Sequence, residues 1–211
     1  SRQTRNAFAR RSCAIDARGG GIVVITPASV FFGILAAAAV VGSAVLFGKW
    51  QTLRRAEYIR TFKRPAGLLA RLEKHHPGFT RKDSALVSRG LRQFFLAYLM
   101  SGRRYVSMPS QAADDLWHEF ILYTREYDAF CRRAFGGFLH HRPAVVLVKE
   151  QRRSNEGLRR VWWYCCKYEN IDPVRPTRLP LLFALDAKLN IANGFIYQDR
   201  KSTRLNSSHE W

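Results

Sequence analysis

Cysteine is scarce in this 211-residue chain, which has only Cys13, Cys131, Cys165 and Cys166. These residues form no CxxC pair and no regular ladder of spacings. A disulfide-stapled scaffold and a cysteine-rich zinc module both need such a pattern, so the sequence argues against both. The scarcity also favours a reducing, cytoplasmic location for the part of the chain outside any membrane.

The sequence also lacks the short motifs that are typical of known catalytic and phosphate-binding sites. The sequence has no glycine-rich phosphate loop, no Walker pattern and no GxSxG nucleophile turn. His118 and Glu119 begin like the HExxH zinc motif, but no second histidine follows at the required position. Alternation of apolar and polar residues with a period of two is almost absent, which predicts an all-α fold.

Acidic residues are few, since Asp and Glu number 16 against 35 Lys and Arg, a net charge of +19. Residues 49–198 hold 27 of the basic and 13 of the acidic residues, a net charge of +14. A surplus of this size suits anionic lipid head groups. Nucleic acid is a less favoured partner, because the basic residues are scattered in pairs such as Arg103-Arg104 and form no long run. The excess of 27 Arg over 8 Lys is also typical of GC-rich bacterial genomes.

One long stretch, residues 19–48, contains no charged residue. Roughly 20 apolar residues, with a rise of about 1.5 Å each, span the hydrocarbon core of a bilayer. We therefore expect a single transmembrane helix over residues 22–48, with the lipid bilayer as its partner and Trp50 at the interface. Arginines also precede the stretch, but if the first 22 residues are not part of the protein, the basic residues between 49 and 64 place the following domain in the cytoplasm by the positive-inside rule.

Both ends of the chain look foreign to the protein. Three glycines followed by Ile22-Val23-Val24 resemble a translated ribosome-binding site before a GTG start, so we expect residues 1–21 to be a doubtful N-terminal extension. Residues 199–211 resemble translated adapter sequence and are set aside as an artefact tail. The remaining residues, 49–198, are expected to form one compact, basic α-helical domain that is long enough for a single core.

Helical spacing of apolar residues, together with glycine and proline breakers, predicts a series of helices in this domain. The transmembrane helix is expected to continue to about residue 63, just before Pro65. One later helix is capped by Thr80 or Asp83, and another has Ser110 as its N-cap. The helices expected after the anchor cover residues 67–75, 83–100, 111–134, 155–168 and 181–190.

A polar cluster is expected on the longest of these helices. Asp114 and His118 are four residues apart, so their side chains can meet on one face of the helix. A carboxylate bonded to one imidazole nitrogen leaves the other nitrogen available as a base or a ligand. Asp115 and Arg125 are supporting candidates, and Arg125 is expected two turns further along the same side.

Beyond the glycines that end this helix, His140 and His141 can fold back toward Asp114 and His118. Three histidines and a carboxylate would make a zinc or iron site. The alternative is structural: Asp114 caps the helix, His118 hydrogen-bonds to it and Arg125 is solvated. These histidines and Asp114 are therefore candidates for a metal or polar site, and no catalytic residue is assigned.

Several motifs resemble a family of uncharacterised, membrane-anchored bacterial proteins. The similarity covers about residues 54–197, and its most specific parts are DDLWHEF at 114–120 and FGGFLHHRP at 135–143. The D-x-x-x-H element, with a tryptophan before the histidine, is also more distantly similar to the core of glycine-rich-domain proteins. The resemblance implies no activity. The positions that it marks for testing are Asp114, Trp117, His118, His140 and His141.

Three functions therefore stay open. The first is a membrane-anchored binding or scaffold module whose protein partner is unknown. The second is a metal-dependent protein or enzyme built on the His/Asp cluster. The third is a basic module that docks on anionic lipid or nucleic acid, which a steep salt dependence of binding would reveal.

Overall fold

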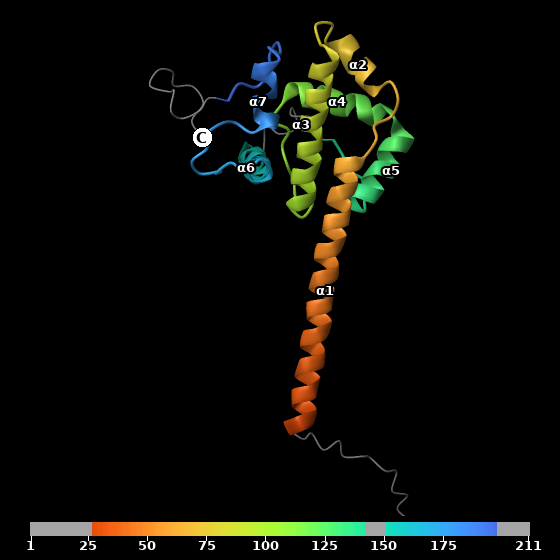
Figure 1. The fold of residues 1–211 in the computed structure, drawn as a ribbon, viewed down its shortest axis with the longest axis vertical. Helices are drawn as coiled ribbons and strands as arrows, with labels where there is room; N and C mark the ends of the chain where they lie inside the picture. The colour runs from red at the N-terminus through yellow and green to blue at the C-terminus, as the bar shows by residue number, and fades with distance from the viewer. Residues whose placement is uncertain (1–26, 142–150, 198–211) are drawn as a thin grey trace, which may run out of the picture. The chain divides into compact units, whose positions relative to one another are not determined.

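The computed structural model describes residues 27–141 and 151–197, and it divides the chain into two compact units, residues 1–45 and 46–211. Seven helices and no strands occur in the described residues, which confirms the all-α expectation (Figure 1). The expected N-terminal extension, residues 22–26 of the expected membrane segment and the whole of the expected artefact tail lie outside the described residues. The helices are α1 Pro27–Thr61, α2 Leu68–His75, α3 Arg81–Met100, α4 Gln111–Leu122, α5 Thr124–Phe135, α6 Gln151–Tyr168 and α7 Leu181–Lys188.

The first helix, α1, combines two kinds of sequence. Its apolar part is long enough to cross a membrane, with a mean hydropathy of 2.5 over its most apolar window, and the large apolar side chains from Val30 to Phe47 are exposed. Its last turns belong to the second unit, where Ala56 and Ile59 are buried in the core. The single apolar helix followed by a compact helical domain confirms the predicted architecture.

The helical domain is organised around α3, which packs against α2, α4, α6 and α7 (Figure 1). The helix starts where the sequence places a cap: the Thr80 hydroxyl accepts a hydrogen bond from the Asp83 amide, and the Asp83 carboxylate accepts one from the Thr80 amide. Further along, Phe94 and Phe95 bury their rings against Trp117 of α4. These contacts with α3 therefore fix the position of α4, the helix that carries the candidate site.

The single helix expected over 111–134 is wrong, because the chain breaks at Tyr123 and continues as α5. Tyr123 leaves the helical region with φ −81° and ψ 64°, while its hydroxyl donates to the carbonyl of Ala66 at 3.2 Å. The break re-aims α5, so that Tyr127 and Phe130 are buried in the core. Neither glycine nor proline marks this break in the sequence.

Candidate metal centre

The N-terminus of α4 is held by a buried carboxylate from the far end of the chain. Asp186 of α7 is 2 % exposed. Its oxygens accept hydrogen bonds from the Ser110 hydroxyl at 2.6 Å and from the backbone amides of Gln111 and Ala112 at 2.7 and 3.2 Å. These amides are among the unpaired donors of a helix start, where negative charge is also favoured by the helix dipole. The first turn of α4, which ends in Asp114, is thereby fixed.

Three ligand-type side chains meet beside this turn: Asp114, His118 and His141. The Asp114 Oδ1 atom lies 2.8 Å from Nε2 of His141, and its Oδ2 atom lies 3.8 Å from Nδ1 of His118. The two imidazole rings are 4.2 Å apart between centroids. One donor atom from each residue lies within 4.8 Å of the other two. Residues 27 positions apart in the chain therefore form one cluster of two imidazoles and a carboxylate.

A chain of buried hydrogen bonds holds the segment that carries His141. The Tyr127 hydroxyl donates to the carbonyl of Leu139 at 2.6 Å and accepts from Nε1 of Trp117 at 3.0 Å. Burial raises the pKa of Tyr127, so the hydroxyl keeps its proton and its donor role. The Trp117 ring meets the His141 ring edge-on at 4.5 Å. Trp117 therefore supports the cluster by packing against the His141 ring, and it offers no ligand atom.

The other predicted site residues lie elsewhere. His140 is exposed, and its ring lies 4.8 Å from that of Phe138. Arg125 is exposed on α5, and no hydrogen bond or ion pair joins it to the cluster within the described residues. Asp115 turns toward α2, where His76 Nε2 lies 3.0 Å from its carboxylate. The structure thus gathers Asp114, His118 and His141, and leaves His140, Arg125 and Asp115 outside.

The cluster has the donor types of a transition-metal site. Zinc bonds to imidazole and carboxylate are about 2.0 Å long, which puts tetrahedral donors about 3.3 Å apart. The separations of 2.8 and 3.8 Å run to different oxygens of Asp114, and one donor atom from each residue lies within 4.8 Å of the other two. The side chains would have to move closer for all three to reach one ion. His118 is the open side of the cluster, with 52 % of its side chain exposed, whereas His141 and Asp114 are 12 % and 22 % exposed. Such a set leaves coordination positions facing solvent.

A second polar contact, between α2 and α4, escaped the sequence analysis. Glu119 is buried and forms ion pairs with Arg71 and with His75, whose Nε2 lies 2.8 Å from Oε1. Burial raises the pKa of Glu119, but the hydrogen bonds from Arg71 and His75 outweigh it, and the pKa is lowered overall. The only sequence signal was the cationic end of α2, which is typical of any helix C-terminus. These contacts hold α2 against α4.

Comparison with known protein families identifies a family for this chain. The model of the UCP032817-like family, an uncharacterised family, matches residues 54–210. The chain belongs to this family. No curated protein and no solved structure matches it. The UCP032817-like match contains all three clustered residues, and it confirms the expected membership of an uncharacterised family. The more distant likeness to glycine-rich-domain proteins stays a prediction.

Proposed function

We propose that this UCP032817-like protein is a single-pass membrane protein whose helical domain binds a divalent transition metal, zinc or ferrous iron. The ligands are Asp114, His118 and His141. The observation that carries the proposal is the meeting of three donor atoms within 4.8 Å of one another. Two of these donors sit on the fixed first turns of α4, and the third arrives from the segment after α5. This is the second of the three functions that the sequence leaves open, and it differs from the first, a scaffold for a protein partner.

Two imidazoles and one carboxylate form the ligand set of catalytic zinc sites and of non-haem iron sites with open positions. A bound ion of this kind supplies a Lewis acid that polarises a coordinated oxygen. The chain itself contributes the orientation of the ligands. The Asp114 carboxylate faces both imidazoles, and Trp117 braces the His141 ring. The exposed side of His118 leaves an approach from solvent.

The membrane part of the proposal rests on α1. Its apolar segment has the length of a bilayer span, and the residues directly after it are basic. Arg54 lies over the ring of Trp50, 4.8 Å from its centroid, an arrangement suited to the head-group region. We place the helical domain in the cytoplasm, in contact with anionic lipid head groups. Alkaline phosphatase fused after residue 197 and expressed in a bacterium should be inactive, whereas high activity would reverse the orientation.

Metal analysis of the purified full chain tests the metal proposal. The protein is prepared in lipid nanodiscs without a histidine tag, and zinc and iron are measured by mass spectrometry. We expect close to one ion per chain, and its loss in Asp114→Asn, His118→Ala and His141→Ala. His140→Ala is the matched control, because it removes the neighbouring exposed imidazole and should keep the ion. Equal metal content in His140→Ala and His141→Ala, with helicity unchanged, would overturn the proposal.

A further inference from the structure

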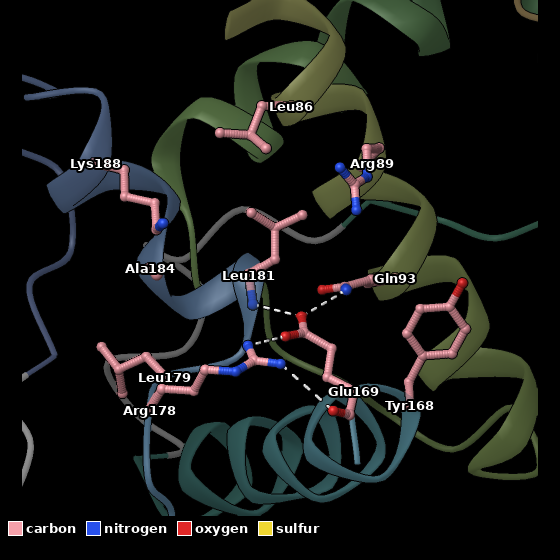
Figure 2. A pocket seen from close by; sticks show the side chains of 10 residues that line it. All are labelled: Leu86, Arg89, Gln93, Tyr168, Glu169, Arg178, Leu179, Leu181, Ala184 and Lys188. Carbon is pink, nitrogen blue, oxygen red and sulfur yellow. Dashed lines mark hydrogen bonds and ion pairs between the residues drawn. The ribbon is translucent and has the colours of Figure 1, made fainter. Parts of the chain in front are cut away.

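A separate cavity of about 530 Å³ opens in the helical domain where α3, the end of α6 and α7 meet (Figure 2). None of the three metal-cluster residues lines it. Its size falls in the range of pockets that hold small organic molecules, roughly 300 to 1,000 Å³. It is therefore a second candidate ligand site among the described residues, and it is open to solvent on one side.

The carboxylate inside this cavity is fully engaged by the protein. Glu169 accepts hydrogen bonds from the Leu181 amide at 2.6 Å and from Nε2 of Gln93 at 2.8 Å, and it pairs with Arg178. Gln93 in turn accepts a hydrogen bond from the Leu182 amide at 3.2 Å. Figure 2 shows the contacts of Glu169 with Leu181, Gln93 and Arg178. Together with the Leu182–Gln93 hydrogen bond, they satisfy the start of α7 and neutralise Glu169. Neither Glu169 nor Gln93 is left to bind a ligand.

What remains open to a ligand is an apolar surface between two cations. Leu86, Leu181 and Ala184 contribute the apolar part. Arg89 of α3 and Lys188 of α7 lie on opposite sides of Leu181, and both are exposed (Figure 2). Among the described residues neither cation has an ion pair or a side-chain hydrogen bond. The cavity thus offers positive charge at its rim and hydrocarbon contact within.

We propose that this cavity binds a small organic anion that carries an apolar body, such as a carboxylate on a hydrocarbon chain. The anionic group binds one of the two rim cations, Arg89 or Lys188, through charge-assisted hydrogen bonds. The hydrocarbon covers Leu181 and Ala184, which releases water from apolar surface. An inorganic anion lacks the second contact, and a neutral alcohol lacks the first. The combination therefore selects amphipathic anions over both.

Calorimetric titration of the full chain in nanodiscs of neutral lipid tests this inference, with empty nanodiscs subtracted. The probes are octanoate, inorganic phosphate and octanol, each at the same ionic strength. We expect octanoate to bind about tenfold more tightly than phosphate or octanol, because only octanoate uses both contacts. Phosphate or octanol binding as tightly as octanoate, or no octanoate binding up to millimolar concentration, would overturn the proposal.

A pair of double variants separates the cavity from the general positive charge of the domain. Arg89→Gln/Lys188→Gln removes two cations at the rim, and Arg81→Gln/Lys82→Gln removes two exposed cations from the start of α3, outside the cavity. The rim variant should weaken octanoate binding about tenfold or more, and the control variant less than twofold. Equal weakening in both would show binding by net charge alone and would refute the site. Leu86→Asp, which puts a carboxylate on the apolar wall, should abolish octanoate binding as well.

Discussion

The hydroxyl of Tyr127 joins the packing of the domain to the metal cluster, and its removal gives a quantitative test. Tyr127 is 1 % exposed, and its hydroxyl is at once the donor to Leu139 and the acceptor for Trp117. Tyr127→Phe keeps the ring and opens no large cavity. It leaves one buried carbonyl and one buried indole N–H without a partner, at roughly 1–3 kcal/mol each. We therefore expect the free energy of unfolding to fall by about 2–6 kcal/mol.

The same substitution should weaken metal binding. His141 follows Leu139 by two residues, and its ring rests against Trp117, so both partners of the lost hydroxyl support this ligand. Outer contacts that orient metal ligands typically contribute about 10- to 100-fold in affinity. Tyr127→Phe should therefore bind zinc more weakly by about this factor, although none of its atoms reaches the ion.

Urea unfolding followed by tryptophan fluorescence measures the first effect, and competition with a chelator measures the second. Tyr98→Phe is the matched control, because the Tyr98 hydroxyl has no side-chain hydrogen bond among the described residues. The control should change stability by about 0.5 kcal/mol or less and leave zinc affinity unchanged. If Tyr127→Phe behaves like Tyr98→Phe in both assays, the support attributed to this hydroxyl is refuted.

Three further predictions concern the rest of the domain. Burial raises the pKa of Glu169, but its hydrogen bonds outweigh this effect and lower the pKa overall. Because the folded state then binds fewer protons than the unfolded state, stability falls as the pH drops below about 4.5. Glu169→Gln should flatten this loss of stability in acid unfolding curves. Gly90→Ala places a methyl group on the Leu185 side chain, so thermal unfolding should show a loss of about 1–3 kcal/mol, and a gain would contradict the tight packing of α3 on α7. Burial raises the pKa of the Cys165 thiol well above its ordinary value and that of Cys166 to about 11. Iodoacetamide at pH 8 should therefore alkylate both cysteines only after unfolding. Rapid labelling of the native protein, mapped by mass spectrometry, would count against their burial.

The local signals in the sequence predicted the helices well. Apolar spacing placed α3, and Thr80, one of two candidate caps, is the residue that caps it. The break at Tyr123 was missed because no glycine or proline marks it, and the contact of its hydroxyl is with Ala66, 57 residues earlier in the chain. The capping of α4 by Asp186 was missed for the same reason, since its partners lie about 75 residues away. Contacts between distant residues leave no pattern in a single sequence.

For the candidate site, too, local spacing was predictable and the contacts made by the distant segment were not. The pairing of Asp114 with His118 follows from helix geometry, and the structure places these side chains together. His140 and His141 could not be separated by sequence, because either neighbour can face the helix once the chain folds back. Successive side chains of an extended segment point to opposite sides. The structure places His141 against Asp114 and leaves His140 exposed, and the Tyr127 hydrogen bond to Leu139 holds the backbone just before these two residues.

X-ray absorption of the zinc-loaded full chain tests the central claim most directly, because it counts imidazole ligands around the ion. With Asp114, His118 and His141 as ligands, the spectrum should show two imidazoles and light-atom donors at about 2.0 Å. His141→Ala should leave one imidazole, and His140→Ala should leave two. A zinc spectrum without imidazole scattering, or one that His140→Ala changes and His141→Ala does not, would contradict the account.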